Sequence, residues 1–269
     1  MSSTFDLYQP GRSWLHRLDP RTKLLLVALG SVLSLLFGNL WIMAGLLICA
    51  HIALWSAKIR RERIAGIWKA TLPTLLMIWV FWVALYGGSG QIIVSLGPVD
   101  ITTYDLAQGG AAALRIGALA FVVMLWLFTT DQATLVRGLV SLGLPYEWGL
   151  TLAIALRYLP TMGGIFRMIS DAQQARALEL TKGSILRRAR AHLPIIVPML
   201  ITALRTAENL SRALESRAFG TSHRRTYLRH LRLRPADWAW MAGTILATAL
   251  LVWARFALGF GSHPLRLLP

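Results

Sequence analysis

Two arginines with small neighbours are the side chains in this sequence best suited to bind another protein. They belong to the triplets Ala175-Arg176-Ala177 and Ser216-Arg217-Ala218. The planar head of an arginine has five N–H donors and can pair with a carboxylate through two parallel hydrogen bonds. Small neighbours leave the approach to such a side chain open. A cation in the last turn of a helix also complements the helix dipole while facing water, so the triplets predict either docking arginines or ordinary helix ends.

Two long helices are expected to position these arginines. The first covers Trp148–Leu180, with a bend at Pro160 and a left-handed terminating residue at Gly183. The second covers Pro194–Phe219, where apolar residues recur every three or four positions, and Gly220 stops it. Helices of this length extend about 40 Å. Each of them places its arginine towards its C-terminal end.

The composition excludes most soluble classes of protein. The 269-residue chain has 28 Lys and Arg against 12 Asp and Glu, a formal charge of +16, yet 55% of it is hydrophobic and 15% is charged. An average soluble domain has about 25% charged residues. Between Asp131 and Pro235 the sequence holds 16 basic and six acidic residues, hence +10 of the +16 charge. That segment is too long for an unstructured loop in a compact protein.

The rest of the sequence contains four apolar blocks of the kind that cross membranes. The first, Leu24–Ala57, has no charged residue and a polar break at Asn39. A single span needs roughly 20 residues, so this block suits a hairpin of two short crossings. Three further blocks suit one crossing each: Ala70–Tyr86, Leu106–Thr130 and Trp238–Ala254. The sequence thus predicts an all-α integral membrane protein with about five transmembrane helices and a cytoplasmic helical domain with two long helices.

Basic residues predict the orientation, since short loops rich in Lys and Arg stay in the cytoplasm. Four of them precede the first apolar block and five follow it, whereas Gly87–Ala107 has none. The N-terminus is therefore expected in the cytoplasm and Gly87–Ala107 outside. Three domains result: residues 1–130 with four spans, residues 131–235 in the cytoplasm or at the membrane interface, and residues 236–269 with the last span.

The sequence contains no arrangement for catalysis or metal binding. A phosphate-binding loop requires a Gly-Lys pair, and none of the four lysines follows a glycine. The six histidines form no i, i+4 pair with acidic support, and Cys49 is the single cysteine. His51 suits a packed polar residue better than a metal ligand, while Arg115 lies in a predicted span, where a charge marks function or faces another helix. We expect no catalytic residue, no metal site and no cofactor in this chain.

Several segments of the chain resemble the transmembrane T component of energy-coupling factor (ECF) transporters, the CbiQ/EcfT-like family. They follow one another in the family's order: Tyr8–Lys23 at the start, Gly143-Leu144-Pro145, Leu156-Arg157-Tyr158-Leu159-Pro160, Ala172-Gln173-Gln174-Ala175-Arg176-Ala177 and Ala213-Leu214-Glu215-Ser216-Arg217-Ala218-Phe219-Gly220. Each motif is short. Their order and the matching membrane topology extend the resemblance over nearly the whole chain.

The resemblance implies a non-catalytic scaffold of an ATP-driven importer. In the family, two cytoplasmic ABC-type ATPases bind ATP and Mg, and a small membrane protein, the S component, captures the substrate. The T component joins them through long coupling helices, so residues 131–235 would be a coupling domain. Arg176 would dock in a groove of one ATPase and Arg217 in a groove of the other. The apolar parts of the two helices, Leu152–Met162 and Leu193–Leu204, are expected to face the S component.

Other residues have lesser expected roles under this resemblance. Both triplets have alanine after the arginine where the family commonly has glycine, which costs backbone freedom at each helix end. Ser216 stands where alanine is frequent. Arg212 is a secondary candidate because Ser211–Glu215 repeats the pattern of the first triplet. The remaining candidates are Glu179 and Glu215 beside the arginines, and Arg157, Pro160, Gly183 and Gly220 as structural motif residues.

Two other functions remain as alternatives. A self-sufficient secondary transporter fits poorly with five spans that show no clear internal repeat. A membrane-tethered nucleic-acid binder would use the basic segment, but its scattered arginines match no reading motif, and residues 224–232 suit anionic lipid better. The expected partners are two ATPases, an S component and the lipid bilayer, without nucleic acid. The expected location is the plasma (inner) membrane of a prokaryote, and cobalt, nickel, biotin and other vitamins stay open as substrates.

Overall fold

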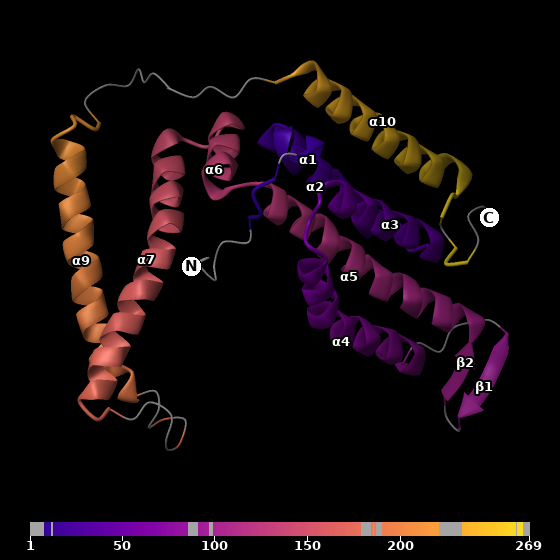
Figure 1. Cartoon of the computed structure of the whole chain (residues 1–269). Helices are drawn as coiled ribbons and strands as arrows, with labels where there is room; N and C mark the ends of the chain where they lie inside the picture. The colour runs from indigo at the N-terminus through magenta and orange to yellow at the C-terminus, as the bar shows by residue number, and fades with distance from the viewer. Residues whose placement is uncertain are drawn as a thin grey trace. The chain divides into compact units, whose positions relative to one another are not determined.

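The structure is a computed structural model of the chain (Figure 1). It describes residues 8–11, 13–85, 91–96, 99–178, 184, 186, 190–220, 233–261 and 263–265. These residues form nine helices and one two-stranded sheet. The chain divides into two compact units. We call residues 7–144 with 231–269 the core unit, and residues 145–230 with 1–6 the two-helix unit.

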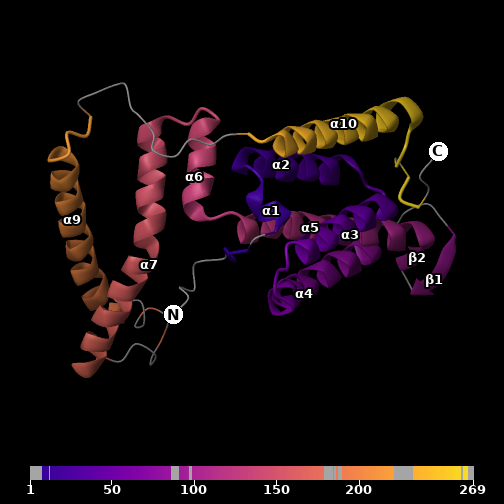
Figure 2. The same ribbon diagram turned by 45° about the horizontal axis from the view of Figure 1, so that its top comes forward.

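The described part of the core unit consists of helices and one β-hairpin. Its helices are α1 (Trp14–Arg17), α2 (Pro20–Leu36), α3 (Leu40–Ser56), α4 (Arg61–Leu85), α5 (Thr103–Thr129), α6 (Gln132–Ser141) and α10 (Pro235–Leu258). Helix α5 packs against α2, α3 and α4, while α10 lies along α2 (Figure 2). The long helix α5 is thus the central element of this unit.

A buried asparagine separates α2 from α3. The Asn39 side chain caps α3 by accepting hydrogen bonds from the backbone N–H groups of Trp41 (2.9 Å) and Ile42 (3.2 Å). Such a cap satisfies donors that have no partner inside the helix. The predicted break at Asn39 is therefore confirmed, and the block Leu24–Ala57 forms parts of two helices of 17 residues each.

Five helices are long and apolar enough to cross a membrane: α4, α5, α10 and the helices of the two-helix unit, α7 (Tyr146–Ala175) and α9 (Leu193–Glu215). The predicted number of about five is confirmed, but the membership differs from the prediction. Helices α2 and α3 have 17 residues each, about 25 Å of helix, which is at the lower limit for a span. By length and composition, α7 and α9 also qualify.

A short β-hairpin occupies part of the predicted outer loop. Strands β1 (Ile92–Leu96) and β2 (Val99–Thr102) pair antiparallel, from Ile92 opposite Thr102 to Leu96 opposite Val99. The β-branched residues in both strands favour extended backbone. No strand is predicted here from the sequence, so the hairpin is an addition to an otherwise all-α set of described elements.

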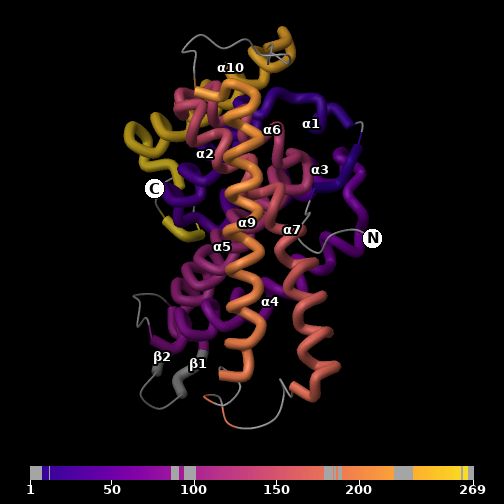
Figure 3. The backbone as a smooth tube through the Cα atoms, turned by 90° about the vertical axis from the view of Figure 1, so that its left-hand side faces the viewer, coloured from indigo at the N-terminus to yellow at the C-terminus, as the bar shows by residue number. Residues whose placement is uncertain are grey.

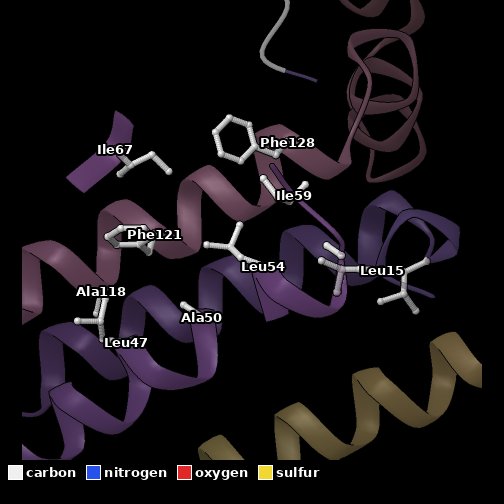
Figure 4. Packing of buried hydrophobic residues seen from close by; sticks show 11 residues of the cluster. Leu15, Leu47, Ala50, Leu54, Ile59, Ile67, Ala118, Phe121 and Phe128 are labelled. Carbon is white, nitrogen blue, oxygen red and sulfur yellow. The ribbon is translucent and has the colours of Figure 1, made fainter. Parts of the chain in front are cut away.

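The buried apolar cluster of the core unit lies mainly between α3 and α5 (Figure 4). Leu54 on α3 and Phe121 on α5 are fully buried within it. Ala50 and Ala118 on the same two helices are also buried, and small residues at such positions let helix backbones approach closely. Leu15 from α1 joins the cluster. Helix α1 is therefore part of the core.

Helices α7 and α9 run antiparallel in the two-helix unit (Figure 3). At one end, the rings of Tyr146 and Phe219 lie with their centroids 6.2 Å apart. At the other end, the side-chain amide of Gln173 donates a long hydrogen bond to the carbonyl of Pro194 (3.5 Å). The start of each helix is therefore close to the end of the other.

Both helices end earlier than predicted. Helix α7 continues through Pro160 and ends at Ala175, and α9 ends at Glu215. The prediction that Gly183 closes the first helix is wrong, because the chain already turns at Ala177, which has a φ of +68°. Gly183 itself lies outside the described residues. Gly220 has a φ of +93°, but it follows the end of α9 rather than making it.

Candidate docking sites at two helix ends

The C-terminal end of α7 has the hydrogen bonds of a Schellman motif. The N–H of Ala177 donates to the carbonyl of Gln174 (2.9 Å), and the N–H of Leu178 donates to the carbonyl of Gln173 (3.1 Å). With its φ of +68°, Ala177 has the left-handed conformation that this motif requires after the last helical residue. Arg176 is therefore the residue at which the helix turns.

The end of α9 repeats this arrangement. The N–H of Ala218 donates to the carbonyl of Glu215 (2.9 Å), and the N–H of Phe219 donates to the carbonyl of Leu214 (3.0 Å). Ala218 has a φ of +56°. Arg217 thus precedes a left-handed alanine, as Arg176 does, and the two hydrogen bonds of the motif agree in length within 0.1 Å between the two ends.

The secondary candidate Arg212 has different geometry. It lies inside α9, where its carbonyl accepts a hydrogen bond from the N–H of Ser216 (3.0 Å). Its guanidinium approaches the carboxylate of Glu208 at 4.0 Å, one turn earlier on the same helix. The sequence pattern around Arg212 resembles the first triplet, but only Arg217 shares the backbone conformation of Arg176.

The left-handed alanines are the feature that sequence reasoning missed. An L-residue other than glycine pays about 1–2 kcal/mol for this conformation, and it persists where surrounding hydrogen bonds determine it. Ala177 and Ala218 stand at the positions where the sequence analysis expects glycine by resemblance. The left-handed turn that glycine would favour therefore forms with alanine at the ends of both α7 and α9. Each arginine directly precedes this turn.

Both arginines are available to a partner. Arg176 and Arg217 are exposed, and neither forms an ion pair with another described residue. The carboxylate of Glu215 accepts a hydrogen bond from the hydroxyl of Ser211 (3.1 Å), which holds it on its own helix. The hydroxyl of Ser216 donates to the carbonyl of Ala213 (3.0 Å). Glu179 lies outside the described residues.

The antiparallel arrangement places the two arginines at opposite ends of the helix pair. Arg176 follows the end of α7, where Gln173 contacts Pro194 at the start of α9. Arg217 lies at the end where Phe219 contacts Tyr146. The 23 residues of α9 extend about 35 Å. Two docking sites on partners would therefore be separated by roughly the length of this helix.

Other predicted residues lie along the same pair of helices. Arg157 is exposed on α7, and Pro160 is half-buried one turn further along. The first half of α9 exposes large apolar side chains: Leu193, Ile196, Val197, Leu200, Ile201 and Leu204. An apolar exposed stripe of this kind suits lipid or a partner helix. The predicted apolar surface over Leu193–Leu204 is therefore present on α9.

A buried lysine at the start of α2 ends the Tyr8–Lys23 motif, and no role is predicted for it from the sequence. Lys23 is 5% exposed, and its ammonium donates to the carbonyls of Thr129 (2.7 Å) and, at longer range, His16 (3.5 Å). The carboxylates of Asp131, Asp19 and Asp237 attract it electrostatically. A buried charge without such compensation would be costly. Only the fold brings these groups together.

The neighbouring His16 is held in its neutral form. One ring nitrogen lies 2.7 Å from the hydroxyl of Ser13 and the other lies 2.9 Å from the carbonyl of Gln9. Burial lowers the pKa of His16 below its usual 6.5, the hydrogen bond to the Gln9 carbonyl opposes this shift, and the charge of Lys23 adds to it. Gly11 packs against the ring so closely that a Cβ there would lie 2.6 Å from it.

Two polar residues inside the core unit have structural partners. His51 lies 2.9 Å from the carbonyl of Leu47 through Nδ1, and its Nε2 accepts a hydrogen bond from the indole of Trp68 (3.0 Å). Arg115 donates to the carbonyl of Phe37 (3.0 Å). Among the described residues, no group of three His, Cys, Asp or Glu side chains could hold a metal ion. His51 is thus a packed polar residue.

Comparison with known proteins gives matches over most of the chain. The family model CbiQ, described as cobalt transport protein, matches residues 11–228. The chain is 32% identical to the energy-coupling factor transporter transmembrane protein EcfT of Thermosediminibacter oceani, over 94% of this chain and 98% of the relative. It is also 32% identical to EcfT of Listeria innocua, over 92% and 96%, and 33% identical to EcfT of Heliobacterium modesticaldum, over 88% and 91%.

Proposed function

Because the chain belongs to the family of energy-coupling factor transporter transmembrane proteins, we propose that it joins two cytoplasmic ABC-type ATPases to a membrane subunit that captures the substrate. It is a multi-pass membrane protein. In this proposal the ATPases bind ATP with Mg and hydrolyse it, and the chain itself has no catalytic residue. It lies in the plasma (inner) membrane of a prokaryote with its N-terminus in the cytoplasm. The substrate is a vitamin or a transition-metal ion.

The observation that supports this proposal is the equivalence of the two arginine ends. Arg176 and Arg217 precede alanines with φ of +68° and +56° and have the same hydrogen-bond pattern. Two arginines at equivalent helix ends of one chain suit binding to two equivalent or closely similar grooves on partner proteins. A pair of related ATPases would present such grooves, and a carboxylate in each would accept the guanidinium through two hydrogen bonds.

The helix pair also has the mechanical properties that coupling requires. ATP-driven closure of two ATPases can move a membrane subunit only through an element that is long, stiff and firmly attached at its ends. Helices α7 and α9 have 30 and 23 residues, and each ends at an exposed arginine. Removing one partner of a buried ion pair costs about 3–5 kcal/mol, so a docked arginine would form a firm joint.

The capture subunit would contact the apolar stripe of α9. Leu193, Val197, Leu200 and Leu204 are each about half exposed or more, at intervals of three or four residues. The polar half of the helix, with Arg205, Glu208 and Arg212, follows this stripe. The exposed apolar side chains of the first half fit contact with a membrane partner, while the polar second half leads to the exposed Arg217.

Purification of the tagged chain from its native membrane in a mild detergent tests the proposal. Mass spectrometry should identify two ATP-binding subunits and a small membrane protein in stoichiometric amounts, and the ligand retained by the small protein would identify the substrate. The Arg176→Glu and Arg217→Glu double variant should lose both ATPases. Arg212→Glu makes the same charge change on α9 within the helix, so it serves as the matched control and should retain them.

Two results would contradict the proposal. Unchanged recovery of both ATPases with the double variant would exclude Arg176 and Arg217 as docking residues. Recovery of the chain alone, together with transport by that chain in liposomes without ATP, would instead identify a self-sufficient secondary transporter.

A further inference from the structure

Residues before α2 contact three other helices of the core unit, α3, α5 and α10. The indole of Trp14 donates to the hydroxyl of Ser56 at the end of α3 (3.2 Å) and stacks on Trp240 of α10, with ring centroids 4.7 Å apart. The backbone N–H of Gln9 donates to the carbonyl of Phe128 near the end of α5 (3.0 Å). The ammonium of Lys23 donates to the carbonyl of Thr129, the residue after Phe128 (2.7 Å).

The carboxylates around Lys23 all lie at helix N-termini. Asp19 caps α2 by accepting from the N–H of Arg21 (3.0 Å), and Asp131 caps α6 by accepting from the N–H of Thr134 (3.1 Å). The third, Asp237, belongs to the first turn of α10. Carboxylates at helix N-termini are stabilised by the helix dipole. The positive charge of Lys23 is attracted by carboxylates at the N-termini of three helices. None of the described carboxylates lies within 4.0 Å of its ammonium, so the attraction acts at longer range.

Asp237 connects two of these helices directly. One of its carboxylate oxygens accepts a hydrogen bond from the backbone N–H of Asp19 (2.9 Å), and the other accepts from the N–H of Arg234 (2.8 Å). Its side chain is 2% exposed. The start of α10 is thus attached to the start of α2 by a buried charged hydrogen bond, which is stronger than a neutral one.

Helix α6 is attached to the same junction. Besides its Asp131 cap, the guanidinium Nε of Arg21 donates to the hydroxyl of Ser141 (2.5 Å) in its last turn. Between these points, α6 approaches α2 so closely that a Cβ on Gly138 would lie 3.0 Å from Pro20. The last turn of this ten-residue helix is therefore attached to the start of α2.

Only a short turn separates α6 from α7. Gly143, with a φ of +113°, donates its N–H to the carbonyl of Val140 (3.1 Å), and Leu144 donates to the carbonyl of Leu139 (3.2 Å). Pro145 then precedes the first residue of α7. These hydrogen bonds hold the turn on the end of α6, and a connection of so few residues can extend only a few ångströms per residue. A displacement of α7 must therefore reach α6 through the chain.

We propose that Lys23, Arg21 and Asp237 are positioning residues for coupling. Lys23 holds the end of α5, Arg21 holds α6 and Asp237 holds α10 on the start of α2, so that a movement of α7 displaces the core unit as one body. Without this junction, α6 would separate from α2, and a movement of α7 would displace α6 without displacing the other helices of the core unit. The inference rests on the proposed function, because the movement originates in the ATPases. It adds a role for Lys23, Asp237 and Arg21 that the docking arginines do not explain.

Distance measurements in the assembled complex test the inference without knowledge of the substrate. Spin labels are placed on exposed Leu35→Cys of α2 and exposed Leu142→Cys after α6, with Cys49→Ser removing the native thiol. The complex with its co-purified ATPases is measured in nanodiscs with and without ATP and vanadate. In the parent protein, the distance between the labels should be the same in both states. In Lys23→Met it should change by about 2 Å or more with nucleotide, the scale of helix shifts in coupled transitions.

Two further variants test the inference if Lys23→Met does not fold. Arg21→Ala removes the bond between α2 and Ser141 and leaves the buried charges in place, so it should show the same nucleotide-dependent change. The matched control is Arg137→Ala, because the guanidinium of Arg137 donates only within α6, to Ala133 and Thr134. That variant should behave like the parent. A merely structural role of the junction would broaden the distances equally with and without nucleotide.

The outcomes separate this inference from the proposed function. The inference would be overturned if the distance between the labels did not respond to nucleotide in Arg21→Ala and in folded Lys23→Met. That result would leave the docking role of Arg176 and Arg217 intact. Absence of ATPases from the purified parent protein would overturn both. Loss of ATPases in the Arg176 and Arg217 double variant, with ATPases retained in Arg21→Ala, would support the separate roles of the two sites.

Discussion

Ala177 and Ala218 occupy the same backbone position, one residue after Arg176 and Arg217, with φ angles of +68° and +56°. They end the two helices of one antiparallel pair, at opposite ends of that pair. In each case the left-handed alanine reverses the chain directly after the arginine. The two candidate docking residues thus have equivalent local surroundings although 41 positions separate them in the sequence.

Glycine at either alanine should stabilise the two-helix unit. Because the left-handed conformation costs an L-residue about 1–2 kcal/mol, we expect Ala177→Gly or Ala218→Gly to increase the free energy of unfolding by about 1 kcal/mol, part of the gain being offset by the greater freedom of glycine in the unfolded chain. Ala213→Gly is the control, since Ala213 follows Arg212 inside α9, and it should decrease stability by about 1 kcal/mol. Thermal unfolding of the purified variants in detergent measures both the expected increase and the expected decrease in stability. A stabilising Ala213→Gly would contradict the helical geometry assigned to Arg212.

Single substitutions should separate the two docking arginines. If each arginine binds one ATPase, Arg176→Ala and Arg217→Ala should each weaken binding of an ATPase by about 3–5 kcal/mol, the cost of leaving a buried carboxylate unpaired. Arg212→Ala should change binding by less than about 1 kcal/mol, because its partner Glu208 is exposed on the same helix. Titration of purified ATPase onto the chain in nanodiscs measures these differences. Equal losses in all three variants would indicate a diffuse electrostatic attraction instead.

Mild acid should loosen the segment before α2. The pKa of His16 is lowered in the folded protein from 6.5, mainly by burial, so the unfolded segment binds a proton more tightly than the folded one. Stability is therefore complete above about pH 6.5 and decreases as the pH falls below that value towards the lowered pKa. Thermal unfolding between about pH 7.5 and about pH 5.5 should show a larger decrease for the parent than for His16→Gln. An identical decrease in both would exclude His16 as the responsible group.

A close approach of α4 to α5 should make one glycine of the core unit intolerant to substitution. A Cβ on Gly109 of α5 would lie 3.1 Å from side-chain atoms of Trp79 and Trp82 and 3.2 Å from the backbone carbonyl of Trp79. The backbone atom cannot move aside, so we expect Gly109→Ala to destabilise the fold by about 1–3 kcal/mol. Gly66→Ala on α4 meets no atom within 4 Å and should be neutral or stabilising. Equal unfolding temperatures for the two variants would be incompatible with the packing of α4 on α5.

Local signals in the sequence predicted several parts of this structure correctly. Asn39 is a polar cap inside an apolar block, and the helix break forms there. The apolar period over Pro194–Phe219 predicted α9 within a few residues. The ends of the long helices were less predictable, because Ala177 has no intrinsic preference for the left-handed conformation that ends α7. The hydrogen bonds of Ala177 and Leu178 to the preceding turn determine that end.

The sequence by itself determined the membrane class, the two long helices and the position of an arginine near the end of each, because composition and helical period depend on neighbouring residues. Tertiary structure decided the junction around Lys23. Its ammonium donates to the carbonyl of Thr129, 106 positions away, and the backbone N–H of Asp19 donates to the carboxylate of Asp237, 218 positions away. A lysine followed by an apolar block has no local feature that predicts burial. Its compensation comes from carboxylates and carbonyls that become neighbours only when α2, α5, α6 and α10 pack together, since a buried charge is stable only with such partners.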